Sequence, residues 1–215
     1  MHFASYYRWL VYQHLFPLPR HDAALLDIGC DDGGFIEQLS VRKSVAIDRA
    51  MSSLRKVQGR FSVCADGTQL PFRDAEFDHV LLSDVIEHVE DDQMLLSTAI
   101  RQIKPQGTLW LSTTASKFKL FPRFITGRAE RSWGHVRKGY TPEQLTSQLT
   151  DHFDYQIVIW PERAFRSCYI LLWICSKWLP DVARLITRLC FEVDVRWPAV
   201  ASEHGHLYLR AVRHG

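Results

Sequence analysis

The sequence predicts a doubly wound α/β fold with a mainly parallel, seven-stranded sheet. Short apolar runs alternate with helix-like segments through residues 21–160, and this alternation is typical of βαβ units. Two of the runs, Ala24–Ile28 and Ser44–Asp48, carry an Asp at or next to their carboxyl ends. A glycine-containing turn, Gly29–Gly33, follows the first run. Sheets of this kind bind ligands where the parallel strands end.

Length and composition limit the class of protein. The chain has 215 residues, of which 47% are hydrophobic, and a formal net charge of +2. This is enough for one α/β domain with a core, and the charge is too small to indicate nucleic-acid binding. The first nine residues lack the features of a signal peptide, so we expect a cytoplasmic protein. The five cysteines form no Cys-x-x-Cys pair, which predicts reduced thiols and no metal site.

We expect one domain, 1–215, in four parts: a leading helix in 1–20, a core over 21–160, a helical insertion over 161–205 and a final strand at 206–213. Within the core, the expected strands are 24–28, 44–48, 61–64, 77–82, 108–112 and 154–160. The expected helices are 34–39, 51–58 and 91–103, with a further helix starting after Thr141. Thr141 is a good N-cap because Pro142 follows it. Pro105 and Gly107 are expected to stop the helix over 91–103.

Five short motifs follow one another in a characteristic order. They are Leu26–Cys30, Ala46–Asp48, Ala65–Phe72, Asp74–Val80 and Val85–Val89. Together they resemble the motifs of class I S-adenosylmethionine-dependent methyltransferases, in particular the small-molecule group that includes enzymes like those of ubiquinone and menaquinone biosynthesis. The resemblance implies the Rossmann-like methyltransferase fold, S-adenosylmethionine as cofactor and a small-molecule acceptor.

The first turn and the strand ends are expected to bind the cofactor. Glycines let the backbone approach a ligand closely, and Asp48 stands where a carboxylate accepts both ribose hydroxyls. The resemblance implies that Asp66 accepts from the adenine amino group. The alternative for both acids is a role in a turn. The predicted cofactor-binding residues are Asp27, Gly29, Cys30, Gly33, Asp48, Arg49, Asp66, Gly67 and Ser83.

The chain departs from the family pattern at Asp31, where the family usually has glycine. Asp31 and Asp32 would lie near the carboxylate of the cofactor, and like charges there disfavour binding. The cofactor also carries an ammonium and a sulfonium group, so the sign of the net effect depends on the geometry.

Two histidines are candidate catalytic bases. His88 follows the fourth strand, where side chains normally face the reacting methyl group. His135 lies in a segment similar to the family's stretch that closes over the active site. Asp84, Arg137 and Tyr140 are predicted to bind the substrate. The alternatives are that His88 holds the start of a helix and that His135 lies in a solvated loop.

Two further segments bear on partners. Residues 117–138 mix basic and apolar side chains, which favours an anionic or lipid-linked acceptor, with a solvated face as the alternative. Residues 165–191 are apolar and aromatic, but their continuous run is shorter than the about 20 residues that span a bilayer. We expect a core helix or a homodimer contact there, with a peripheral membrane contact or a substrate lid as alternatives.

The leading functional hypothesis is therefore methyl transfer from S-adenosylmethionine to a small acceptor. The second is a non-catalytic binding or regulatory subunit with the same fold, since Asp31 is unusual and no base is decisive. A nucleic-acid methyltransferase is disfavoured because the chain has no Asn-Pro-Pro-Tyr-type motif and no appended basic domain. An NAD-dependent oxidoreductase is disfavoured because no Gly-x-Gly-x-x-Gly follows the first strand.

Overall fold

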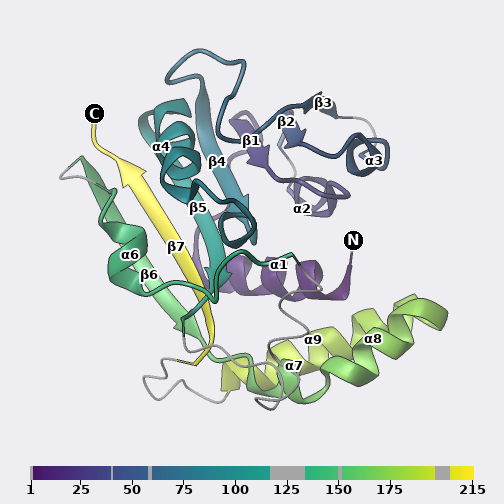
Figure 1. Cartoon of the computed structure of the whole chain (residues 1–215). Helices are drawn as coiled ribbons and strands as arrows, with labels where there is room; N and C mark the ends of the chain where they lie inside the picture. Colours follow the sequence, from purple (N-terminus) through teal and green to yellow (C-terminus); the bar gives the residue numbers. More distant parts are fainter. Residues whose placement is uncertain (1, 40, 58–59, 117–133, 150–151, 197–203) are drawn as a thin grey trace.

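The computed structural model describes residues 2–39, 41–57, 60–116, 134–149, 152–196 and 204–215. Within these residues, seven strands form one sheet in the order β3-β2-β1-β4-β5-β7-β6 (Figure 1). The strands are β1 (Ala24–Ile28), β2 (Lys43–Asp48), β3 (Phe61–Cys64), β4 (Phe77–Ser83), β5 (Ile103–Thr114), β6 (Phe153–Trp160) and β7 (His206–Arg213). Strands β1 to β5 pair in parallel, and β7 is antiparallel to both β5 and β6. The predicted fold class is confirmed.

Helices cover both faces of this sheet. They are α1 (Phe3–Leu15), α2 (Gly34–Gln38), α3 (Met51–Leu54), the 3-10 helix η1 (Ile86–His88), α4 (Asp92–Gln102), α6 (Pro142–Thr146), α7 (Arg163–Ser167), α8 (Tyr169–Trp178) and α9 (Pro180–Arg196). Because side chains alternate along a strand, neighbours such as Leu25 and Leu26 join different clusters. Leu25 packs in the cluster of α1, α2 and α9, and Leu26 packs in the cluster of α4 and α6.

The largest differences from the predicted bounds are at the start of β5 and at the end of α3. Helix α4 ends at Gln102, and β5 begins at Ile103, before Pro105. Ile103 pairs with Phe77, and the register then shifts before the next pair. Pro105 therefore lies within an irregular strand, where a missing backbone N–H is tolerated. Helix α3 ends at Leu54 instead of residue 58, and Leu54 is its buried residue, so packing supports little more than one turn.

The insertion between β6 and β7 contains α7, α8 and α9. Helix α9 packs against α1, whereas α8 and α9 form a hairpin that projects from the body (Figure 1). The side chain of Leu172 in α8 is buried, but most of the other α8 side chains are exposed. The expected core helix is thus wrong for most of α8. Within the described residues, every helix is too short or too polar to cross a bilayer.

Candidate active site

A cavity of about 670 Å³ opens at the carboxyl edge of the parallel strands. Its walls come from the ends of β1 and β2 and from the segments after β2, β3 and β4, together with Gly134 and Val136. This volume is within the range of pockets that hold cofactors and small molecules. The position is the one that parallel α/β sheets use for ligand binding.

The cavity brings together about half of the predicted site residues. Those that line it are Gly29, Asp48, Arg49, Asp66, Gly67, Asp84 and His88. Those that do not line it are Asp27, Cys30, Gly33, Ser83, His135, Arg137 and Tyr140. The second group is close in sequence to the first, but most of its side chains face the sheet interior or neighbouring segments.

The turn after β1 adopts backbone conformations that glycine favours. Gly29 has φ of +75°, and a Cβ there would overlap the methyl groups of Val85. Asp31 has φ of +45°, which Asp tolerates better than most residues. Its carboxylate accepts a hydrogen bond from the Ser53 hydroxyl at 3.2 Å, and Asp31 does not line the cavity. The expected repulsion between Asp31 and a ligand carboxylate is reduced because the side chain is held by α3.

Asp48 is held in place at the cavity wall by backbone donors. Its Oδ1 accepts from the N–H of Ala50 at 2.7 Å, and its Oδ2 accepts from the N–H of Asp31 at 3.1 Å. Each carboxylate oxygen has more than one lone-pair site. The carboxylate is therefore oriented by the fold and can still accept from a ligand.

Asp66 lines the same cavity and also forms a turn. Its Oδ1 accepts from both the N–H and the hydroxyl of Thr68, at 2.9 and 2.8 Å. These hydrogen bonds hold the pKa of Asp66 below its ordinary value, so the carboxylate is charged at neutral pH. The turn role that the sequence left as an alternative is therefore present.

Two predicted cofactor residues are buried beneath the cavity. Burial, together with the charge of Asp48, raises the pKa of Asp27 to about 7. Burial also raises the pKa of the Cys30 thiol, so this thiol is protonated and unreactive at neutral pH. Neither residue has the exposure that direct contact with a ligand in this cavity requires.

Asp84, directly after β4, is the most constrained residue of the site. It has φ of +53°, a sparsely populated conformation for a side chain other than glycine. Its carboxylate pairs with Arg8, contacts His206 Nε2 at 2.6 Å and accepts from the Ser112 hydroxyl at 3.1 Å. Burial alone would raise the pKa of Asp84, but Arg8 and His206 hold it well below its usual range.

Sequence reasoning missed these partners of Asp84. Arg8 belongs to α1, Ser112 to β5 and His206 to β7, and no motif marks them. The available signal for Arg8 was weak: it is a charged residue in an aromatic-rich helix, between Tyr7 and Trp9 in the sequence. Such a residue needs a partner when the helix is buried.

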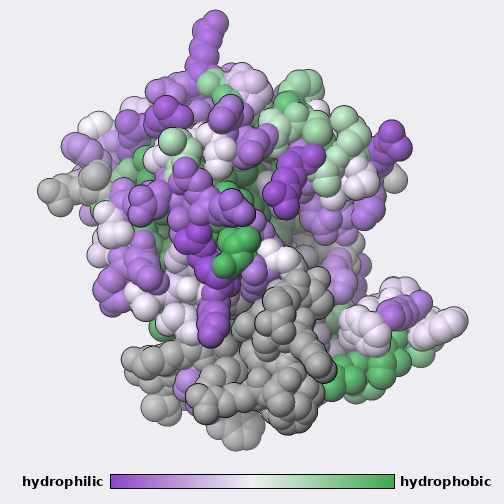
Figure 2. Space-filling model, viewed as in Figure 1, coloured by the Kyte–Doolittle hydropathy of each residue, from purple (hydrophilic) through white to green (hydrophobic). Residues whose placement is uncertain are grey.

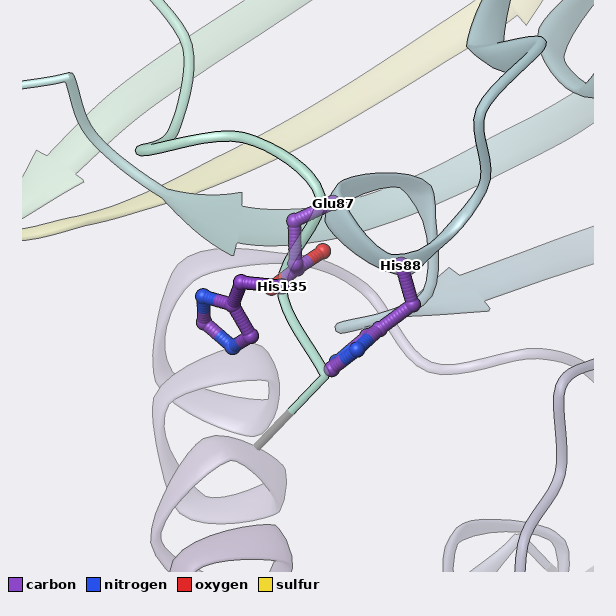
Figure 3. Close-up of side chains that lie close together, drawn as sticks. All are labelled: Glu87, His88 and His135. Atoms are coloured by element: carbon purple, nitrogen blue, oxygen red, sulfur yellow. The ribbon is translucent and has the colours of Figure 1, made fainter. Parts of the chain in front are cut away.

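Glu87, His88 and His135 form a cluster beside the cavity. Figure 3 shows Glu87 and His88 extending from η1 toward His135, which comes from the segment after residue 133. The two imidazole centroids lie 4.7 Å apart, with the rings nearly perpendicular at 88°. Candidate ligand atoms of the three residues lie within 4.8 Å of one another. The cluster therefore has the size that either proton transfer or a metal ion requires.

The protonation states of the cluster favour proton transfer. Burial raises the pKa of Glu87 to about 8, with a further contribution from the charge of Asp84, and the Thr113 hydroxyl donates to Glu87 at 2.9 Å. Burial lowers the pKa of His135 to about 4, helped by His88. At pH 7 the Glu87 carboxyl is therefore mainly neutral, and a metal would need it deprotonated.

Arg137 and Tyr140 fix the segment that carries His135. The Arg137 guanidinium pairs with Asp92 and donates to the carbonyl of Glu90 at 2.7 Å. The Tyr140 hydroxyl donates to the Ile86 carbonyl at 3.0 Å and to Asp92 Oδ2 at 2.9 Å. These polar groups are committed to α4 and to the residues before it. Residues 117–133, where the sequence places a basic cover, lie outside the described residues.

The fold and the cavity together place a candidate ligand site at the strand ends of an α/β sheet. Residues 26–111 match a family model described as a methyltransferase domain. This match supports the resemblance to class I S-adenosylmethionine-dependent methyltransferases that the motifs predicted.

Curated relatives match the chain over part of its length. A ubiquinone biosynthesis O-methyltransferase of Methylobacterium nodulans is 29% identical over 153 residues, which cover 62% of this chain and 60% of the relative. A protein of Methanocaldococcus jannaschii is 31% identical over 84 residues, which cover 39% of this chain and 41% of the relative. The chain thus spans roughly half the length of these curated relatives.

Solved methyltransferases share the fold at low sequence identity. Phosphoethanolamine N-methyltransferase 2 of Haemonchus contortus, in complex with S-adenosyl-L-methionine, has a TM-score of 0.71 at 16% identity, covering 97% of this chain and 52% of that one. A SAM-dependent methyltransferase of Archaeoglobus fulgidus has a TM-score of 0.65 at 18% identity, covering 96% and 93%.

Proposed function

We propose that the protein transfers a methyl group from S-adenosylmethionine to a hydroxyl group of a small, lipophilic acceptor. The observation that carries the proposal is the placement of Asp48 and Asp66 on one cavity wall, at the ends of neighbouring strands. Two carboxylates that the fold holds on one wall of the cavity suit the sugar and the base of an adenosyl group. The choice of a hydroxyl acceptor follows the name of the Methylobacterium relative, an O-methyltransferase.

The residues present fit the cofactor. Asp48 would hold the ribose, Asp66 the adenine amino group, and Gly29 would leave room for the methionine part. When bound, S-adenosylmethionine supplies a methyl group on a positively charged sulfur. The chain then contributes mainly by positioning the two reactants and by excluding water.

A hydroxyl acceptor reacts faster when it loses its proton. His88 lines the cavity, so we assign it the role of accepting that proton. His135 lies beside the His88 ring and is neutral at pH 7, so it adds no repelling charge when His88 becomes protonated.

Replacing His88 with Ala should lower kcat by about 10²-fold or more and leave cofactor affinity unchanged. Addition of EDTA should leave kcat unchanged, because the mechanism uses no metal.

Calorimetric titration with S-adenosylmethionine and S-adenosylhomocysteine tests the cofactor site. We expect micromolar binding to the wild type and a loss of at least about tenfold in Asp48→Ala, since a charge-assisted hydrogen bond is removed. Asp22→Ala is the matched control, because Asp22 is an exposed acid outside the cavity. Equal affinity in wild type and Asp48→Ala would contradict the proposed site. Cofactor binding without transfer to any offered acceptor would instead indicate a non-catalytic subunit.

A further inference from the structure

The connection between β6 and β7 is far longer than the sheet requires. Antiparallel neighbours can be joined by as few as two residues, yet residues 161–205 separate these two strands. The inner face of α9 explains how the insertion is held. Its buried residues are Ala183, Thr187, Cys190, Phe191 and Asp194, and α9 packs against α1. Among the described residues, the opposite face of α9 is exposed.

Large apolar side chains gather on this outer face. Of the sixteen exposed large apolar side chains among the described residues, ten lie between Ile170 and Val193. On α9 they recur at three- and four-residue spacing, which forms one stripe along a helix. The stripe consists of Val182, Leu185, Leu189 and Val193, all at least 40% exposed.

Helix α8 continues the apolar surface. Ile170, Ile174 and Trp178 recur every four residues and are 61%, 49% and 80% exposed. Figure 2 shows the hydrophobic surface gathered along one edge of the projecting hairpin, away from the sheet. We call α8 and α9 with these exposed side chains the hairpin surface. Its concentration of apolar groups exceeds what isolated surface residues explain.

The charges around the hairpin surface are mainly positive. The exposed basic residues of α8 and α9 are Lys177, Arg184, Arg188 and Arg196, and the exposed acids are Asp181 and Glu192. Lys177 Nζ lies 3.5 Å from the centroid of the Trp173 ring, and Arg184 lies over the ring of Tyr6 at 4.8 Å. Aromatic rings next to long cationic side chains are typical of surfaces at the boundary between water and lipid.

We propose that the hairpin surface docks the protein on an anionic lipid bilayer. The apolar stripe enters the boundary between headgroups and acyl chains, and the basic side chains contact lipid phosphates. Among the described residues, no helix is long and apolar enough to span the bilayer, and we infer that the hairpin surface lies on one leaflet. A second copy of the chain fits less well as the occupant, because a self-contact would bring the same positive charges together.

Vesicle flotation tests the proposal with the whole 215-residue chain. We expect flotation with vesicles of phosphatidylglycerol and phosphatidylcholine, weaker flotation with phosphatidylcholine alone, and weakening at high salt. Leu185→Glu/Leu189→Glu should reduce the bound fraction at least about tenfold. Arg184→Gln/Arg188→Gln should reduce binding to anionic vesicles by about tenfold. The same variant should change binding to neutral vesicles little.

The matched control is Leu18→Glu/Phe61→Glu, which places two acids at other exposed apolar positions, 45% and 67% exposed. It should float like the wild type. Circular dichroism and S-adenosylmethionine affinity show that each variant is folded, independently of any methyl transfer. Flotation of the Leu185→Glu/Leu189→Glu variant at the wild-type level would overturn the proposal. The proposal would also be overturned by a second pair of results. In that case the wild type does not float, and sedimentation velocity shows a wild-type dimer that Leu185→Glu/Leu189→Glu dissociates.

Discussion

Asp84 shows how a single residue at the end of a strand is stabilised by partners from distant parts of the chain. Arg8 contributes from α1, Ser112 from β5 and His206 from β7. The side chains of Arg8 and Asp84 are 13% and 28% exposed, so their charges are largely removed from water. A charge in this environment is tolerated because it is paired.

Removing one partner of this ion pair should therefore destabilise the protein more than removing both. We expect Arg8→Met to lower the free energy of unfolding by about 3 kcal/mol, because a partly buried carboxylate loses its counter-charge. Arg8→Met/Asp84→Asn should recover at least half of that loss. Urea unfolding at pH 7 measures both values. Equal losses in the single and double variants would show that the pairing is not the cause.

Asp27 should make stability depend on pH. Its folded pKa, about 7, is above the ordinary unfolded value. The neutral form is favoured in the folded state, so its contribution is complete below about pH 4 and is lost as the pH rises through about 7. Asp27→Asn, which cannot ionise, should exceed the wild type in stability by about 2 kcal/mol or more at pH 8.

Urea unfolding of the ligand-free protein at pH 5 and pH 8 checks this expectation. The difference in unfolding free energy between Asp27→Asn and the wild type should grow toward pH 8. A difference that is constant between the two pH values would show that Asp27 does not titrate in this range. Asp22→Asn provides the control, because that carboxyl is at the surface.

At the scale of elements, Arg137 joins the segment of His135 to the residues before α4. We expect Arg137→Ala to lower kcat by about tenfold or more, since small displacements of catalytic groups are costly, without a large change in acceptor KM. Arg137→Lys should restore part of the loss, because one cation can still reach Asp92. Steady-state kinetics of the wild type, Arg137→Ala and Arg137→Lys measure kcat and the acceptor KM. A raised KM with unchanged kcat would instead support the predicted contact between Arg137 and the acceptor.

Strands were predicted better than the helices because their sequence signals are local. The bounds of β1 and β3 are those expected, and β4 is one residue longer, at Ser83. Apolar runs bounded by Gly, Asp or Pro define such short buried strands. The early start of β5 at Ile103 could not be predicted, since it depends on pairing with Phe77 across the sheet.

Part of the candidate site was predicted because its residues follow strands that have local sequence signals. The motif residues Gly29, Asp48 and Asp66 follow strands, and strand ends of a parallel sheet converge by topology. Arg8 and His206 reach Asp84 from opposite ends of the sequence. Their roles follow from tertiary packing, which no local pattern contains.

At the scale of the whole molecule, one buried hydrogen-bond network connects α1, β6, α7 and α9. The Tyr7 hydroxyl donates to Asp194 Oδ2 at 2.6 Å and accepts from Trp160 Nε1 at 2.9 Å. Asp194 also accepts from the N–H groups of Ala164 and Phe165, at 2.7 and 3.2 Å. The network fixes the base of the insertion against the helix that supplies Arg8.

Tyr7→Phe should lower the free energy of unfolding by about 1–3 kcal/mol, because a buried N–H and a carboxylate each lose a partner. Tyr155→Phe, at a position 52% exposed, should have little effect. Thermal unfolding followed by circular dichroism measures both variants. Equal midpoints for Tyr7→Phe and the wild type would show that the hydroxyl does not contribute to stability.

The place of β7 between β5 and β6 has a consequence for synthesis on the ribosome. Residues 206–213 emerge after every other strand, yet they form the bridge that attaches β6 to the sheet. The nascent chain can therefore assemble β1 to β5 early, but β6 waits for its neighbour. His206 arrives with the same strand, so Asp84 acquires its last partner only when translation has passed that codon.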